Sequence, residues 1–214
     1  MEKVHTNKTV AIVCHLLFAL AVGPLLVLYS KTQSLLWVNG HNTPLLDTVM
    51  YHITRLPEIA FIIFVVLLAL FTQRRYLLAV TVAMLLCLSV ILLTKYLIFA
   101  DAERPFSILS KFNIPFHKVP GIALHRNGSF PSGHTMAAFC SLALAGFIGN
   151  RPLLQILFFI VAVLSGYSRI YVAQHFLMDV YTGALTGFVI ALIVFIVMEK
   201  KFRTPYWQSP LIKI

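Results

Sequence analysis

Charged residues are scarce in this chain. Lys, Arg, Asp and Glu make up 11% of the 214 residues, whereas 59% are hydrophobic. A soluble globular domain carries roughly 25% charged residues, and the mean hydropathy here is +0.88. The scarcity excludes an ordinary soluble domain and predicts an integral-membrane protein whose solvent is the lipid bilayer.

Acidic residues and cysteines are scarcer still. Seven Asp and Glu stand against seventeen Lys and Arg, which gives a formal net charge of +10. Nucleic acid would require a basic stripe interleaved with exposed aromatic residues, which the sequence lacks, so we expect the cations to meet anionic lipid headgroups. The three cysteines, Cys14, Cys87 and Cys140, fall within apolar stretches and have no metal-ligand spacing. We therefore expect no nucleic acid, no metal and no other cofactor.

Long apolar runs determine the expected fold. A transmembrane helix needs about 20 apolar residues, and the last run is about twice that length, so it must contain two helices. The second run is short and is expected to begin earlier, near Met50. We predict an all-α membrane protein, a bundle of six transmembrane helices that forms one integral-membrane domain over residues 1–214. The runs are 10–29, 59–71, 76–99, 135–149 and 153–198.

The ends of these runs predict the orientation. Lys3 and Lys8 precede the first run as in a secretory signal, but apolar sequence continues through Leu28, so we expect a retained helix. With six spans both termini share a side, and the cations on that side predict that it is the cytoplasm of a bacterial inner membrane, with the longer connections on the periplasmic face. These nine of the seventeen Lys and Arg are Lys3, Lys8, Arg74, Arg75, Arg151, Lys200, Lys201, Arg203 and Lys213.

Three polar clusters interrupt the apolar sequence on the predicted outer side. They are KYLIFADAERP at 95–105, PSGH at 131–134 and SRIYVAQHFLMD at 168–179. The first two have plain structural explanations, because Lys and Arg at a helix end can snorkel to the headgroups and Ser132 can cap a helix. The third is harder to explain by structure alone, since Arg, His and Asp at membrane depth are costly unless they are paired and used.

The cations of these clusters indicate an anionic ligand. Lys95, Arg104 and Arg169 are permanently charged donors suited to a group with two or more negative charges. Ser132 and Gly133 would begin a helix whose free N–H groups form a second anion site, and glycine lets the anion approach the backbone. The expected ligand is therefore a phosphate.

The histidines supply the reactive groups. His175 and Asp179 stand four residues apart, so on a helix the carboxylate can accept the proton of one ring nitrogen and leave the other free to attack. This spacing predicts His175 as the nucleophile. His134 follows the predicted anion-binding turn and is placed to protonate the departing oxygen; taken alone, it could equally be a hydrogen-bond partner between helices.

Together these residues resemble the type 2 phosphatidic acid phosphatase family, relatives of the vanadium haloperoxidases and the bacterial acid phosphatases. Two motifs match at every defining position: Pro-Ser-Gly-His, and Ser-Arg followed after five residues by His and after three more by Asp. The first motif departs, since eight residues separate Lys95 from Arg104 where the family usually has six. The order of spans is similar to that of the membrane branch along nearly the whole chain.

The resemblance implies a role for each motif residue. In the family the nucleophilic His forms a phosphohistidine, the Asp holds it in the reactive tautomer, and the second His acts first as acid and then as base. These roles fall on His175, Asp179 and His134. The residues expected to hold the phosphoryl oxygens are Lys95, Arg104, Ser132, Gly133 and Arg169.

The predicted function is a metal-independent, integral-membrane lipid phosphate phosphatase. A site at the outer helix ends, beside the apolar loop 106–130, suits an amphiphile whose tails stay in lipid. Lys111, Lys118 and Arg126 in that loop could meet a second phosphate. They favour a polyprenyl diphosphate, such as undecaprenyl diphosphate, over phosphatidic acid, phosphatidylglycerol phosphate or the phosphates of lipid A.

Other classes of protein remain open at this point. A channel or transporter would spread its charges through several spans, whereas here they gather at one face. A phosphotransferase of the same fold, passing the phosphoryl group to another lipid or sugar, differs only in the acceptor, and a vanadate-dependent oxidase needs bound vanadate. The stretch NGHNTPLLD at 39–47 lies on the same outer side and is expected to cap a helix rather than to rim the site.

Overall fold

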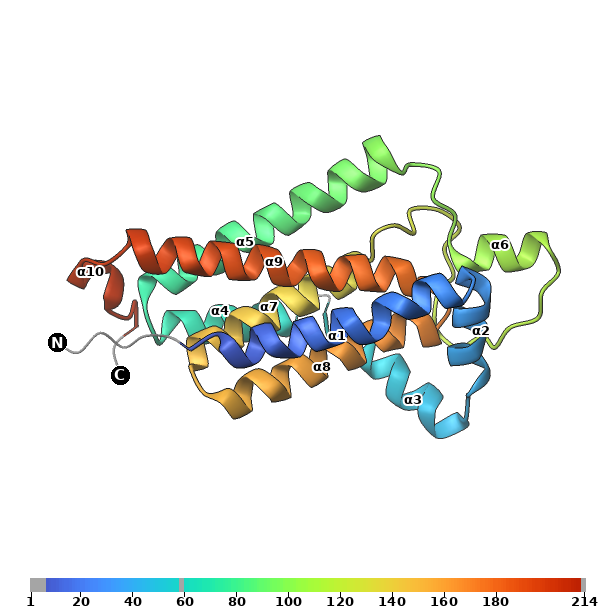
Figure 1. The fold of residues 1–214 in the computed structure, drawn as a ribbon, viewed down its shortest axis with the longest axis horizontal. Helices are drawn as coiled ribbons and strands as arrows, with labels where there is room; N and C mark the ends of the chain where they lie inside the picture. The colour runs from blue at the N-terminus through green and yellow to red at the C-terminus, as the bar shows by residue number, and fades with distance from the viewer. Residues whose placement is uncertain (1–6, 58–59, 213–214) are drawn as a thin grey trace.

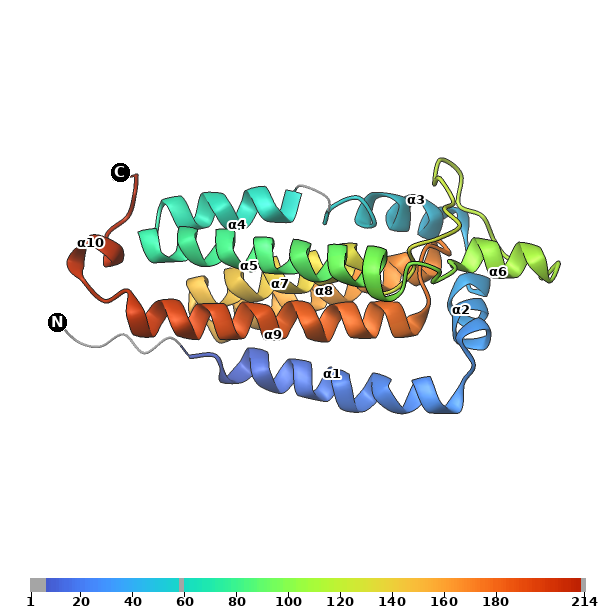
Figure 2. The same ribbon diagram turned by 90° about the horizontal axis from the view of Figure 1, so that it is seen from above.

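The computed structural model describes residues 7–57 and 60–212, which form an elongated bundle of helices (Figures 1 and 2). Three short helices gather toward one end of the bundle, and α10 lies at the other (Figure 1). Lys3 and Lys213 lie outside the described residues. The long elements are α1 (Thr9–Leu28), α4 (Ala60–Leu70), α5 (Arg74–Leu93), α7 (Gly133–Gly149), α8 (Pro152–Tyr171) and α9 (Leu177–Lys201); the short ones are α2 (Lys31–Gly40), α3 (Pro44–Ile53), α6 (Pro105–Lys111) and α10 (Pro205–Gln208).

The predicted all-helical membrane class is confirmed. Among the described residues, four helices are long and apolar enough to cross a bilayer, namely α1, α8, α9 and the segment Arg74–Ile98, which joins α5 to a π-helical turn. The helices α4 and α7 are apolar but shorter, with 11 and 17 residues. The count of six spans therefore stays a prediction. Nearly all of α7 is buried, and it packs against α4, α5, α8 and α9.

The sequence analysis expected the second transmembrane helix to begin near Met50, and this prediction is wrong. Met50 belongs to α3, which ends at Ile53, and α4 begins only at Ala60. Between them the backbone N–H groups of Arg55 and Leu56 bond carbonyl oxygens three residues earlier, so the helical ladder breaks in a tight turn. The separate helix α3 was missed because the short second run was extended backwards to reach the length of a full span, although Thr54, Arg55 and Pro57 interrupt the apolar sequence between the two helices.

The last apolar run is two helices, as predicted, and the turn between them needs no glycine. Ala173 takes the left-handed conformation with a φ of 53°. Its N–H donates to the carbonyl oxygen of Ile170, and that of Gln174 donates to the carbonyl oxygen of Arg169, which is the Schellman pattern that ends a helix. A left-handed alanine costs about 1–2 kcal/mol, so glycine is the residue usually expected at such a position. The absence of a glycine therefore gave no indication of where this turn lies.

Two glycines let α9 lie directly against α7. A methyl group at Gly183 would stand 2.6 Å from the carbonyl oxygen of Ser132, and one at Gly187 would stand 2.3 Å from that of Met136. Such distances are far inside van der Waals contact, so a side chain at either position would force the helices apart. This spacing of small residues is typical of close helix contacts in membranes, and it brings the start of α9 against the start of α7.

Candidate active site

The turn between α8 and α9 holds the predicted nucleophile. His175 is fully buried and lies outside any helix, in contrast to the helical placement used in the sequence analysis. Its backbone N–H donates to the carbonyl oxygen of Arg169 at 3.1 Å. This bond folds the turn so that Arg169 and His175 lie close together. Its ring Nδ1 lies 3.3 Å from Oδ2 of Asp179. Within the described residues, its Nε2 is buried and has no hydrogen-bond partner.

One carboxylate oxygen of Asp179 organises this turn. Besides the His175 ring, Oδ2 accepts hydrogen bonds from the Ser129 hydroxyl at 2.5 Å and from the backbone N–H of Phe176 at 2.9 Å. The Phe176 bond also caps the first turn of α9. Ser129 was missed by the sequence reasoning, because it stands outside the motifs in a loop. Three donors converging on one oxygen fix the carboxylate relative to the imidazole.

Arg169 reaches the site from the last turn of α8. Its side chain is buried, and one terminal nitrogen donates to the hydroxyl of Thr54 at 2.5 Å. Thr54 is itself buried at the end of α3. Nothing in the sequence pattern around Thr54 indicated this role, since the contact joins residues 115 positions apart.

The second motif begins α7. Ser132 is the N-cap of this helix, and its hydroxyl oxygen accepts hydrogen bonds from the Thr135 hydroxyl at 2.8 Å and the Thr135 N–H at 3.4 Å. Its backbone N–H donates to the carbonyl oxygen of Asp179 at 3.0 Å, which ties the second and third motifs together. Gly133 and His134 are the first two residues of the helix and are half-buried. The capping role considered for Ser132 is thus observed, whereas its contact with phosphate stays a prediction.

Arg104 is held by the loop that faces it. Its Nε donates to the carbonyl oxygen of Asn127 at 3.0 Å, and a terminal nitrogen donates to the side-chain oxygen of Gln174 at 2.6 Å. The other terminal nitrogen reaches the carbonyl oxygen of Gly128 at 3.4 Å, and Gln174 in turn donates to the carbonyl oxygen of Ala123 at 2.5 Å. Arg104 and Gln174 therefore fasten residues 123–128 to the turn that carries His175.

Lys95 lies in the π-helical turn Thr94–Ile98, in which the Phe99 N–H donates to the carbonyl oxygen of Thr94 at 2.7 Å. Such wide turns recur at functional sites because they redirect side chains. Lys95 is close enough to interact electrostatically with Arg104, Arg169 and Asp179. The eight-residue spacing in the first motif therefore does not keep Lys95 from the other cations.

Burial and nearby charges shift the pKa values of the site residues that lie outside the membrane-spanning helices. Desolvation, aided by the positive charges of Arg104 and Arg169, lowers the pKa of His175 to about 3, against the opposing effect of its Asp179 hydrogen bond. The imidazole is therefore neutral at neutral pH, as a nucleophile must be. Burial likewise lowers the pKa of Arg104, and that of His125 is lowered by desolvation and by the three motif cations.

The chain is similar to known proteins in sequence and in fold. Residues 76–203 match the PAP2 superfamily; no curated protein sequence matches. The crystal structure of LpxE from Aquifex aeolicus is similar at 26% sequence identity and a TM-score of 0.59, over 75% of this chain and 92% of that one.

A second solved structure has the same fold. It is that of a transmembrane PAP2 type phosphatidylglycerolphosphate phosphatase from Bacillus subtilis, with 24% identity and a TM-score of 0.61, over 93% of this chain and 99% of that one. The family match includes all three motifs, from Lys95 to Asp179, and spans more than half of the sequence. The resemblance predicted from the motifs is confirmed, and this chain belongs to the PAP2 superfamily.

Proposed function

We propose that this protein hydrolyses a lipid phosphate at the membrane surface through a phosphohistidine on His175. As a member of the PAP2 superfamily it is an enzyme that hydrolyses phosphate esters; the intermediate, the residue roles and the substrate are our proposal. The observation that carries the proposal is the His175 imidazole, whose Nδ1 faces Asp179 while its buried Nε2 has no hydrogen-bond partner among the described residues.

Two displacements make up the reaction. In the first, Nε2 of His175 attacks phosphorus, the bond from phosphorus to the leaving oxygen breaks, and His134 gives that oxygen a proton. In the second, His134 takes a proton from water, the resulting hydroxide attacks phosphorus, and the N–P bond breaks to release phosphate. Asp179 keeps the proton on Nδ1 and stabilises the positive ring that forms.

Positive charge replaces a metal in this mechanism. The Lys95, Arg104 and Arg169 side chains and the first N–H groups of α7 can neutralise the phosphoryl oxygens as their charge develops. Ser132 and Gly133 contribute at that helix start, where a glycine leaves the backbone accessible. Arg104 would have to share its donors between phosphate and the loop carbonyls that it now contacts.

Exposed apolar residues beside Lys95 support an amphiphilic substrate. Tyr96, Leu97 and Ile98 continue directly from this lysine and are strongly exposed, so they would face lipid tails in a bilayer. A substrate tail could lie along them while its head reaches the cations. This arrangement is what a phosphorylated membrane lipid needs and what a soluble sugar phosphate does not.

Two loop cations support a diphosphate within that class. Arg126 and Lys118 stand over the same ring, with the guanidinium carbon 5.1 Å and the ammonium nitrogen 5.9 Å from the centroid of Phe106. The carbonyl oxygen of Arg126 accepts a hydrogen bond from the backbone N–H of Arg104 at 2.7 Å. Arg126 and Lys118 therefore lie next to Arg104, which we propose binds the phosphate. Their charges would attract a second phosphate, which favours a polyprenyl diphosphate such as undecaprenyl diphosphate.

A panel of lipids tests the proposal. Phosphate release by the purified protein should proceed in excess chelator, and vanadate should inhibit it because its five-coordinate adduct resembles the transition state. The panel compares undecaprenyl diphosphate, phosphatidic acid, phosphatidylglycerol phosphate and lipid A, each with and without acceptor lipids. Preference for a monophosphate or for lipid A would overturn the choice of a diphosphate substrate. Transfer of the phosphoryl group to an acceptor lipid would show that the protein is a phosphotransferase. Release of phosphate from soluble sugar phosphates alone would contradict the assignment of a lipid substrate.

We further propose that the site faces the periplasm and that both termini are cytoplasmic. Ser110 in α6 and Arg151 in the turn between α7 and α8 are both exposed, so a cysteine at either position is available to a reagent. An impermeant thiol reagent should label Ser110→Cys but not Arg151→Cys in intact cells, and the unsubstituted chain sets the background from its three native cysteines. The reverse pattern would place the site in the cytoplasm.

A further inference from the structure

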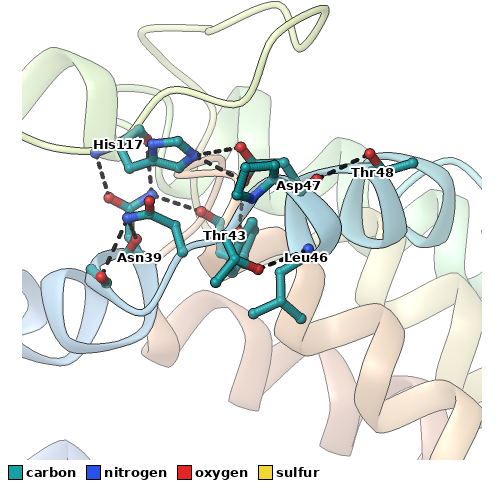
Figure 3. Close-up of polar contacts among 10 residues, drawn as sticks. Asn39, Thr43, Leu46, Asp47, Thr48 and His117 are labelled. Carbon is teal, nitrogen blue, oxygen red and sulfur yellow. Dashed lines mark hydrogen bonds and ion pairs between the residues drawn. The ribbon is translucent and has the colours of Figure 1, made fainter.

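A polar cluster outside the three motifs lies at the end of α8 (Figure 3). It joins Asn39 at the end of α2, Asp47 in α3 and His117 in the loop 106–130, which we call the outer loop. The sequence analysis expected the stretch 39–47 to cap a helix, and His117 lies in the loop 106–130 that it placed beside the site. The stretch does cap a helix, since the Thr43 hydroxyl accepts a hydrogen bond from the Leu46 N–H at 3.2 Å at the start of α3. In addition, the side chains of Asn39, Asp47 and His117 meet around Tyr171, the last residue of α8.

Asn39 uses both ends of its fully buried amide. Its nitrogen donates to the carbonyl oxygens of Tyr171 at 2.7 Å and His117 at 2.9 Å, while its oxygen accepts from the His117 N–H at 2.8 Å. The turn after α8 supplies donors for the carbonyl oxygens of Ser168, Arg169 and Ile170. The Tyr171 carbonyl is the remaining one of the four that a helix end leaves without an intrahelical donor, and Asn39 satisfies it.

Asp47 holds the other end of the same residue. Its Oδ1 accepts a hydrogen bond from the Tyr171 hydroxyl at 2.6 Å, and its two oxygens lie 2.8 and 2.9 Å from Nε2 of His117. Tyr171 is fully buried, so its side chain cannot turn toward water in search of another partner. The residue is therefore fixed through its carbonyl by Asn39 and through its hydroxyl by Asp47.

The position of Tyr171 decides what this cluster can do. The residue stands between Arg169 and His175, whose backbones are joined across the turn. A shift at the end of α8 would move the guanidinium and the imidazole together relative to the phosphate held by α7. Catalysis is sensitive to such shifts, because a misplacement of about 1 Å can cost about 10²-fold in rate.

We propose that Asn39 and Asp47, with His117, are positioning residues that fix the end of α8 so that Arg169 and His175 act on the same phosphoryl group. This inference rests on the proposed function for the identity of that group. The three residues touch neither substrate nor reacting atoms; they act through Tyr171. The same contacts fasten the first half of the outer loop, whose second half is fastened by Arg104 and Gln174.

The test compares Tyr171→Phe and Asn39→Ala with the parent enzyme. Tyr171→Phe removes only the hydroxyl that bonds Asp47, and it should lower kcat about tenfold while KM changes less than about twofold. Asn39→Ala removes the bonds at both backbones and should lower kcat further. Vanadate affinity, measured by calorimetry, should fall in parallel with kcat because vanadate mimics the transition state. Thr48→Ala is the matched control, since Thr48 neighbours Asp47 but its hydroxyl donates to the carbonyl oxygen of Pro44 within the same helix.

The outcomes separate positioning from a purely structural role. A structural role predicts a lower melting temperature with unchanged kcat per folded molecule and unchanged vanadate affinity, and that result would overturn the proposal. If the parent enzyme hydrolyses no lipid phosphate, the proposed function fails, and the ratios of vanadate affinity among the same variants still decide for or against positioning.

Discussion

Replacing His175 with Ala should abolish phosphate release, with a loss of at least about 10⁴-fold in kcat. In the proposed mechanism the imidazole forms the covalent bond to phosphorus, and its Nε2 is the buried atom for which the described residues offer no hydrogen-bond partner. Direct attack by water would lose the covalent route, in which two easier displacements replace one difficult step. Phosphate release from the lipid panel by the purified variant measures the loss.

Controls for this variant follow from the same structure. Circular dichroism should show an unchanged helix content, since Ala removes a ring without adding bulk. His52→Ala, at an exposed position in α3, should keep full activity and shows whether loss of any histidine matters. Rapid quenching with radiolabelled substrate should trap an acid-labile phosphoenzyme in the parent but none in His175→Ala. Substantial turnover by a folded His175→Ala protein would show that the mechanism is wrong.

Hydropathy and residue spacing predict much of the fold, but they describe only one chain segment at a time. The apolar runs located every long helix, because burial in lipid demands about 20 apolar residues whatever the neighbours are. They did not separate α3 from α4, because the expected span length outweighed the polar residues and the proline, Thr54, Arg55 and Pro57, that mark this boundary. They also placed His175 on a helix, because the left-handed backbone of Ala173 has no signature in its side chain.

The residues of the candidate site also fall into two groups, those that the sequence could identify and those that it could not. The motif residues could be selected because cations, histidines and an aspartate are costly in a membrane and are spaced in a familiar pattern. Ser129 and Thr54 could not, since each is an ordinary hydroxyl residue whose partner is 50 or 115 positions away. Lys95 joins the other cations through a π-helical turn, which eight-residue spacing alone does not reveal. Contacts between distant segments therefore account for most of what the sequence analysis missed.

Replacing Asp179 with Ala should lower kcat/KM about 10⁴-fold, which is the size of the loss in a catalytic triad when the histidine is no longer held in its reactive tautomer. Without the carboxylate, the proton of His175 is no longer held on Nδ1, so the ring can turn its N–H toward phosphorus. The positive charge that develops on the ring as the N–P bond forms also loses its counter-charge. Phosphate release by the folded variant measures the effect.

Asp179→Asn separates these two contributions. Because the donors from Ser129, Phe176 and His175 all converge on Oδ2, the amide oxygen should take that place and accept the same three hydrogen bonds. The tautomer of His175 is then kept and only the charge is lost, so we expect a smaller decrease, of about 10²–10³-fold. Ser129→Ala, which leaves both charge and tautomer in place, should cost least of the three. Equal losses for Asn and Ala would contradict this order and show that the amide fails to hold the tautomer, whereas near-normal activity of Asp179→Ala would remove Asp179 from the mechanism.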